Sequence, residues 1–306
     1  MKPDTQHWQA GAALALATAL IWGVLPIGLK VTLIDLDVWT VTWWRFVGAA
    51  LIIGLWLAHR GELPALGRLG TTTRRWLVIA TLGLAGNYML YVIGLDLTTP
   101  SVAQVVIQLA PFLLLSAGVV VFREAFSGWQ KLGCAILLMG MLLFFNRRLP
   151  LLLQLTDRWT LGVLALVVGA VAWAVYGVAQ KFLARELGSL QTLWLLFIAC
   201  ALVILPATQP LAILDLDARG VGALLFCVLN SVLGYGCFSF ALQRWDVTRV
   251  SAVTTTAPLF TLAFMRAAAH IEIDWLEPET VNLPTVIGAL MVVGGSILAA
   301  LASQRR

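Results

Sequence analysis

One arginine lies deep inside an apolar stretch of this chain. Arg45 is about eight residues from the nearer end of its predicted helix, or roughly 12 Å at 1.5 Å per residue. A charge at that depth is costly in a bilayer, so the side chain faces protein or a water-filled cavity. No Asp or Glu lies equally deep. Arg45 therefore binds either backbone carbonyls or a carboxylate or phosphate on a solute, which a guanidinium grips through two parallel hydrogen bonds.

The lack of a buried acid also bears on the class of solute. Export of lipophilic cations coupled to protons needs a membrane-embedded acid that alternates between proton and drug. Glu124 is predicted at an inner helix end and Asp96 at an outer turn. The sequence therefore favours zwitterions or organic anions. The remaining basic residues near the ends of apolar stretches are expected to extend toward the membrane surface; they are Lys30, Lys181 and Arg266.

Polar side chains form matching stripes in two apolar stretches. Gln104, Gln108 and Pro111 follow i, i+4, i+7 spacing and share one helix face. At an offset of 147, the same spacing recurs in Ser251, Thr255 and Pro258. A proline inside a helix frees a backbone carbonyl and permits a kink. Such stripes either line a cavity or join helices by hydrogen bonds, and their symmetry favours the cavity.

Aromatic and amide side chains are expected to complete the wall of this cavity. Aromatic surfaces with a few amides and hydroxyls suit amphipathic organic solutes of amino-acid size. Any single aromatic could equally face lipid. The remaining candidate cavity residues are Trp22, Asn87, Tyr88, Tyr91, Trp173, Tyr176, Gln180, Asn230 and Tyr235.

The composition indicates which elements position these residues. The chain is 60% hydrophobic and 11% charged, whereas soluble domains are roughly a quarter charged. Its apolar stretches have bilayer-spanning length, about 20 residues, and must be helical to satisfy their backbone polar groups. We expect an all-α integral membrane protein of ten helices, over 11–33, 38–58, 76–95, 98–121, 128–146, 160–181, 190–208, 220–243, 247–269 and 283–302.

The two halves of the chain repeat each other. The pairs are Trp22 with Trp173, Tyr88 with Tyr235, Ala110-Pro111 with Ala257-Pro258, and Gly133 and Gly140 with Gly288 and Gly295. If each half holds five spans, the second enters the membrane inverted, as in many secondary transporters. The expected division is a first five-helix repeat at 1–147, a periplasmic linker at 148–159 and a second repeat at 160–306.

Charges in the short loops predict the orientation. With the N-terminus inside, twelve Lys and Arg residues fall in inner loops and tails and four in outer loops, so both termini are expected in the cytoplasm. Arg147 and Arg148 are the local exception in the outer linker. The pI of 9.3 then reflects attraction to anionic lipid rather than nucleic-acid binding.

Other chemistries have little support in the sequence. The histidines lie in tails, loops or helix edges, no carboxylate pair lies within the apolar spans and no HExxH motif is present, so an enzyme is not expected. The cysteines show no paired spacing and are expected to be small buried hydrophobes without metal or redox function; they are Cys134, Cys200, Cys227 and Cys237. We expect no cofactor.

Together these residues resemble the drug/metabolite transporter superfamily, specifically its EamA-type ten-helix members. The resemblance rests on Trp22-Gly23, Arg45-Phe46, Ala110-Pro111, Arg123-Glu124 and the repeated glycines. The second half departs from the pattern at His270-Ile271-Glu272, where the Arg-Glu step is replaced, so a role for Glu124 need not be mirrored. The resemblance implies inverted repeats, a central cavity and movement of small metabolites such as amino acids across the inner membrane, with export as the direction.

The predicted function is therefore secondary transport of small organic metabolites across a bacterial inner membrane by alternating access. Amino acids or other carboxylate-bearing solutes are the expected cargo. The expected partners are the solute and membrane lipid, with no nucleic acid, and the expected state is a monomer. Two alternatives remain. One is a flippase or carrier of an amphipathic lipid-linked intermediate, which predicts a cavity open sideways to the bilayer. The other is multidrug efflux.

Overall fold

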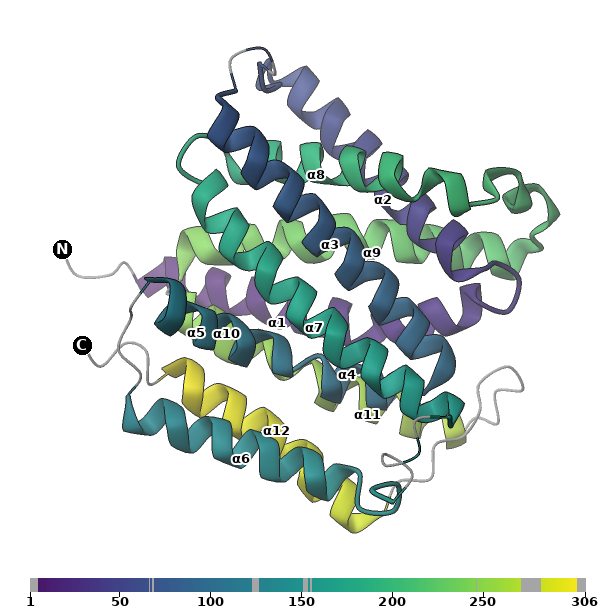
Figure 1. The fold of residues 1–306 in the computed structure, drawn as a ribbon, viewed down its shortest axis with the longest axis vertical. Coiled ribbons are helices and arrows are strands. Elements are labelled where there is room, and N and C mark those ends of the chain that lie inside the picture. The colour runs from purple at the N-terminus through teal and green to yellow at the C-terminus, as the bar shows by residue number, and fades with distance from the viewer. Residues whose placement is uncertain are drawn as a thin grey trace.

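The described part of the protein is helical throughout. The structure is a computed structural model, which describes residues 5–65, 67, 69–122, 127–150, 154, 156–245, 247–270 and 282–301. No strand occurs among these residues. Seven of the helices are long and apolar enough to cross a membrane, and further apolar helices are shorter. The protein is therefore a multi-pass helical membrane protein (Figure 1).

The long helices begin and end close to the predicted positions. They are α1 (Thr5–Thr32), α2 (Val38–His59), α3 (Thr71–Leu97), α7 (Arg158–Leu183), α8 (Ser189–Ile204), α9 (Ala218–Arg244) and α12 (Leu283–Leu301). Three of them start at an aspartate whose carboxylate accepts a backbone N–H of the first turn: Asp37 before α2, Asp157 before α7 and Asp217 before α9. Such caps satisfy N–H groups that have no partner within the helix.

The shorter helices correct one feature of the prediction. They are α4 (Pro100–Val106), α5 (Leu109–Phe122), α6 (Gly128–Phe144), α10 (Val247–Thr254) and α11 (Ala257–His270), with 3-10 turns η3 (Leu205–Ala207) and η4 (Pro210–Asp215). The ranges 98–121 and 247–269, each predicted as one helix, are therefore both divided in two. The division falls near the middle of each range.

Proline chemistry accounts for both breaks. Pro111 has no N–H to donate to the carbonyl four residues earlier, Ile107 O. That carbonyl instead accepts from Ala110 N at 2.9 Å, and α4 ends just before it. In the second break, Pro258 has no N–H to donate to Thr254 O, and the next residue, Leu259, donates to Thr256 O three residues back at 2.9 Å rather than to Thr255 O four residues back. The kinks were predicted at the prolines themselves, whereas in the structure the helices are interrupted two to four residues before each proline.

The helices pack in pairs, with the broken helices between them. α1 packs on α9, α3 on α7, α2 on α8 and α6 on α12. In Figure 1, α6 and α12 lie together at one edge, α2 and α8 lie toward the opposite edge, and α4, α5, α10 and α11 lie nearer the middle. The start of α1 and the end of α12 lie on the same side of the bundle, which we call the termini side; the opposite side is the far side.

Glycines bring α6 and α12 into backbone contact. A Cβ atom on Gly133 would lie 2.7 Å from Gly295 O, and one on Gly140 would lie 2.8 Å from Gly288 O. Any side chain at these positions would push the helices apart. The contact is therefore van der Waals packing of two backbones, as small residues permit in membrane helices.

Candidate functional site

One cavity of about 740 Å³ lies between the helices. Its lining includes every residue predicted to bind solute: Trp22, Arg45, Asn87, Tyr88, Tyr91, Gln104, Gln108, Trp173, Tyr176, Gln180, Asn230, Tyr235, Ser251 and Thr255. These side chains come from seven helices and from the two helix breaks, and they are spread over both halves of the chain. Of the two predicted kink residues, Pro111 lines the cavity and Pro258 is buried outside the described lining.

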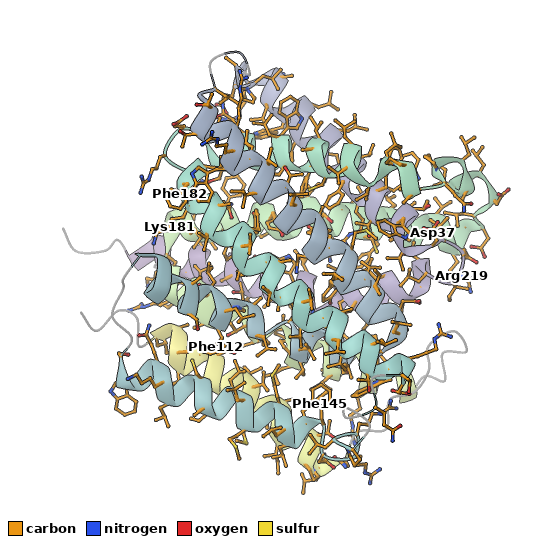
Figure 2. All side chains as sticks on the ribbon, viewed as in Figure 1. Asp37, Phe112, Phe145, Lys181, Phe182 and Arg219 are labelled. Carbon is orange, nitrogen blue, oxygen red and sulfur yellow. The ribbon has the colours of Figure 1, made fainter. Side chains whose placement is uncertain are left out.

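The described lining of the cavity reaches the termini side of the bundle. Its lining extends to Lys181, Leu242 and Ala300, which lie near the last residues of α7, α9 and α12. Figure 2 shows Lys181 at this end of α7, with Asp37 and Arg219 on the far side. Toward the far side the described lining stops at Leu25, Arg45, Tyr91 and Gln104, about four to seven residues, or roughly 6–10 Å, inside the far ends of α1, α2, α3 and α4.

Contacts between helices close the far side. Lys30 Nζ donates to Asp96 O at 2.9 Å, which joins α1 to the last turn of α3. Deeper in the bundle, Thr261 Oγ1 donates to Gly23 O at 2.7 Å, and α4 packs against α11. The structure therefore holds a cavity that is open toward the termini side and closed toward the other.

Arg45 lies at the closed end of the cavity and is 3% exposed. Its Nε donates to Ser231 Oγ at 3.3 Å, and its guanidinium carbon lies 4.7 Å from the centroid of the Tyr88 ring. Neither a carboxylate nor a backbone carbonyl partners the guanidinium among the described residues. Because Nε is already used, the two terminal nitrogens are the ones left to bind an oxyanion end-on.

Aromatic rings form much of the remaining wall. Trp22 packs edge-on to Tyr235 with centroids 5.7 Å apart and lies 5.5 Å from Phe238. Tyr88 lies 4.7 Å from Phe46, a fully buried ring behind the cavity. These contacts fix the rings in place, so the wall presents a rigid, mostly apolar surface suited to the body of an organic solute.

Four amide side chains tie the helices around the cavity together. Each donates from its nitrogen to a backbone carbonyl of another helix or helix break. The bonds are Asn87 to Gly169 O at 2.9 Å, Gln104 to Trp22 O at 2.5 Å, Gln108 to Thr255 O at 2.5 Å and Asn230 to Ile21 O at 2.5 Å. The two alternatives for the polar stripes are thus both present: Gln104 and Gln108 line the cavity and also join helices.

Gln108 and Thr255 meet where the two broken helices cross. They are the residues that the 147-residue offset pairs, and each lies in the break of its own helix. Prolines near these positions prevent regular helical bonding, so local carbonyls need other donors. Gln108 supplies one. The broken helices are therefore joined directly at their breaks.

Several cavity residues were not predicted. Ser231, Phe238, Thr254 and Ser296 line the cavity, and Ser231 contacts Arg45 directly. Ser231 follows Asn230 inside an apolar stretch, and that polar pair was the available signal. Lys181, expected only to extend toward the membrane surface, is exposed and also lines the cavity mouth. Arg266 is exposed and is not part of the described lining.

Some expectations fall on residues outside the described ranges. Arg123-Glu124, Ile271-Glu272 and part of the 148–159 linker lie there. Among the described residues no cluster of His, Cys, Asp or Glu could hold a metal. The four cysteines are free, and three of them are buried.

Comparison with known proteins identifies the family. The model of the EamA-like transporter family matches residues 9–146 and 160–301. An uncharacterized transporter of Haemophilus influenzae is 38% identical over 95% of this chain and 94% of its own length. The uncharacterized inner membrane transporter YhbE of Escherichia coli K12 is 37% identical over 95% of this chain and 91% of its own length.

A solved structure supports the fold independently. That crystal structure of a protein chain superposes with a TM-score of 0.69 at 18% identity, covering 96% of this chain and 97% of its own. At that identity the likeness concerns the fold alone. With the family match over nearly the whole chain and a cavity lined from both halves, the protein is a membrane transporter that belongs to the EamA-like transporter family.

Proposed function

We propose that the protein is a monomeric secondary transporter with ten membrane spans in two inverted five-helix repeats. α4 with α5 forms one span and α10 with α11 another, and the other eight α-helices are one span each. The repeats occupy 1–147 and 160–306, joined by a periplasmic linker at 148–159. The separate family-model matches to 9–146 and 160–301 support this division.

The helix contacts support a two-fold relation between the repeats. If α1 corresponds to α7 and α3 to α9, exchanging the repeats converts the α1–α9 contact into the α7–α3 contact, and both exist. The glycines behave likewise. Sequence pairs Gly133 with Gly288, whereas in space Gly133 meets Gly295 and Gly140 meets Gly288. Such crossed pairing is what a two-fold axis produces.

We place the chain in a bacterial inner membrane with both termini in the cytoplasm. The excess of Lys and Arg in the loops on the termini side supports this orientation. The related YhbE of Escherichia coli is named an inner membrane transporter. In this orientation the cavity opens to the cytoplasm, where an exporter loads its cargo. Closure of this side and opening of the far side would complete an alternating-access cycle.

The proposed cargo is a small organic metabolite that carries a carboxylate, such as an amino acid or another organic acid. The observation that carries this proposal is Arg45: a buried guanidinium at the closed end of the cavity, without a carboxylate partner among the described residues. The described lining contains two basic residues, Arg45 and Lys181, and no acidic one. A cavity of this charge attracts anionic groups and disfavours lipophilic cations.

Ligand-dependent thermal stability tests the proposal. The purified protein is heated with amino acids, dicarboxylates, phosphorylated metabolites and quaternary cations. A solute at 100 times its dissociation constant stabilises the folded state by about 2.7 kcal/mol. We expect carboxylates to raise Tm, and we expect the rise to vanish in Arg45→Ala. Arg45→Lys keeps the charge but not the planar fork, so it should retain only part of the effect.

A matched control is Arg266→Ala, which removes an exposed arginine outside the cavity lining. It should leave the ligand-induced rise unchanged. Stabilisation by cations alone, unaffected by Arg45→Ala, would overturn the assignment of carboxylate cargo and favour multidrug efflux instead.

A further inference from the structure

We propose that Lys181 is a gate residue on the termini side of the cavity. In the state that is closed on this side, the Lys181 ammonium donates a hydrogen bond to the main-chain carbonyl of Gln243 and joins the end of α7 to the end of α9. This inference rests on the proposed alternating-access cycle and deepens it, because it names a contact that forms when the cavity mouth closes.

On the far side, a lysine and a main-chain carbonyl already make such a contact. Lys30 Nζ donates to Asp96 O at 2.9 Å. Lys30 lies in the last turn of α1, and Asp96 lies in the last turn of α3. The carbonyls of a last helical turn have no donor within their own helix, and the residue four positions after Asp96 is Pro100, which has no N–H. Asp96 O is therefore available to hold the far end of α1.

The repeat places the same two groups on the termini side. The offset of 151 residues between α1 and α7 carries Lys30 onto Lys181, and the offset of 147 between α3 and α9 carries Asp96 onto Gln243. The helix ends obey the same offsets, since α1 and α7 end at residues 32 and 183, and α3 and α9 end at residues 97 and 244. Gln243 O is thus also a carbonyl of a last helical turn, without a donor in its own helix.

These two groups border the open mouth of the cavity. Lys181 lines the mouth and is exposed, and Leu242, the residue before Gln243, lines it as well. Figure 2 shows Lys181 near the end of α7 on the termini side. Lys30 is half-buried in the closed contact, so the two corresponding lysines differ as a closed end differs from an open one. A bond between Lys181 and the end of α9 would draw these two helix ends together at the mouth.

The helix contacts show the same difference between the two sides. α1 contacts α3 and α4, whereas the corresponding pairs, α7 with α9 and α7 with α10, make no comparable contact among the described residues. In the same way α4 packs on α11, but α10 and α5 do not pack comparably in the described part of the chain. Other contacts occur in both forms, such as α2 with α9 and α8 with α3. Exchanging the two arrangements between the repeats therefore closes the termini side and brings α7 to α9, the pair that carries Lys181 and Gln243.

The two lysines should act on the transport cycle in opposite directions. Lys30 stabilises the state that is closed on the far side, and Lys181 stabilises the state that is closed on the termini side. A hydrogen bond between membrane helices changes such an equilibrium by about three- to thirtyfold. Removing the donor should shift the populations by that factor, toward the far-side-open state for Lys30 and away from it for Lys181.

Side-specific labelling of one cysteine in the cavity measures these populations. Leu25 lines the closed end of the cavity, and it is replaced by cysteine in the full-length protein whose four native cysteines are changed to alanine. A membrane-impermeant maleimide is added without solute to spheroplasts or to inverted vesicles, so that it enters from one side only. The ratio of the far-side labelling rate to the termini-side rate reports how often the cavity opens to each side.

Lys30→Met and Lys181→Met remove the donor and keep most of the length of the side chain. We expect the ratio to rise about three- to thirtyfold in Lys30→Met and to fall by the same factor in Lys181→Met. The double variant should return toward the parent ratio, which keeps the fall measurable where far-side labelling of the parent is slow. Lys181→Arg retains a donor and should stay close to the parent.

Lys131→Met and Gln243→Ala are the controls. Lys131 is exposed near the start of α6, outside the described lining, so its substitution removes an equal charge without removing the gate. Gln243→Ala keeps the main-chain carbonyl that accepts the bond. Both should leave the ratio unchanged. Size-exclusion profiles establish that each variant is folded, and Lys181→Ala replaces Lys181→Met if the latter does not fold.

The possible failures are distinguishable. If Lys181→Met does not lower the ratio, either alone or in the Lys30→Met background, the gate is overturned, and Lys181 then only attracts solute or extends toward the membrane surface. If no variant is labelled from the far side while labelling from the termini side persists, the alternating-access cycle is overturned, and with it the proposed function.

Discussion

The α6–α12 pair and the crossing of the broken helices are both contacts between corresponding helices of the two halves, yet they are built differently. In the α6–α12 pair, glycine backbones touch, and a Cβ atom at Gly133 or Gly140 would collide with main-chain atoms. At the crossing, a side-chain amide from Gln108 spans the gap to Thr255 O. The first contact depends on shape, and the second depends on a hydrogen bond.

This difference suggests different roles. Two helices packed backbone to backbone move together, because atoms already in van der Waals contact leave no space into which one helix could shift without displacing the other. A contact made through a flexible glutamine at a helix break tolerates changes in angle, since the break already lacks regular helical bonds. We interpret α6–α12 as the fixed support and the crossing as the place where the halves of α4–α5 and α10–α11 can change direction.

The largest expected effect comes from Gly140→Leu. A Cβ atom here would lie 2.7 Å from Val292 N and 2.8 Å from Gly288 O, so the backbones of α6 and α12 must separate. Overpacking a tight contact costs roughly 1–3 kcal/mol or more, and this one involves main chain on both sides. We expect loss of folded, monodisperse protein, measured by size-exclusion chromatography and Tm.

Gly294→Leu is the matched control for that substitution. Gly294 lies in α12 next to Gly295, but nothing lies within 4 Å of a Cβ atom built there. The variant should fold with an unchanged Tm. Equal damage from both substitutions would contradict the view that close packing of α6 on α12 is the fixed support.

A smaller effect is expected from Gln108→Leu. The substitution keeps the volume of the side chain but leaves Thr255 O without its donor. Hydrogen bonds between membrane helices are worth roughly 0.6–2 kcal/mol, so Tm should fall by a few degrees while the protein still folds. Transport into proteoliposomes should fall more than stability, because in the proposed alternating-access cycle the crossing is where the helices change direction. A loss of folding as complete as in Gly140→Leu would remove the contrast between the two regions.

The same contrast explains what could be read from the sequence. The spacing of Gln104, Gln108 and Pro111 recurs at an offset of 147 residues. Of the six residues in the two stripes, the structure places all but Pro258 in the described lining of one cavity. Periodicity identifies which helix face is polar. It could not predict that each helix stops before its proline, because the break depends on which carbonyl finds another donor. Nor could it show that Gln108 bonds Thr255 across the repeats, since that requires the relative position of the two helices.

Ser231 shows a second limit of the same kind. Serine is common in membrane helices, and its position after Asn230 was only a weak signal, so it is the contact with Arg45 that indicates a role. The deep position of Arg45, by contrast, follows from helix length alone, and the structure leaves it buried at the closed end of the cavity. A charged residue deep in an apolar helix can be identified from the sequence, whereas the role of a common polar residue such as serine depends on which residues it contacts in the folded protein.

The smallest effect is expected from Ser231→Ala, and it sharpens the comparison because it should change binding without changing stability. Ser231 Oγ accepts from Arg45 Nε at 3.3 Å and donates to Cys227 O within its own helix. Without it the Tyr88 ring still lies 4.7 Å from the guanidinium, and such cation–π contacts contribute roughly 0.5–2 kcal/mol. Arg45 should remain in the cavity but turn more freely, so carboxylate affinity should fall about two- to fivefold while Tm without ligand stays constant.

Isothermal titration on the Ser231→Ala variant measures this affinity. The control is Thr18→Ala, which removes a similar hydroxyl-to-carbonyl bond outside the described lining. A drop in Tm as large as that of Gln108→Leu would mean that Ser231 joins helices rather than positions Arg45. Its role would then be structural and not in solute binding.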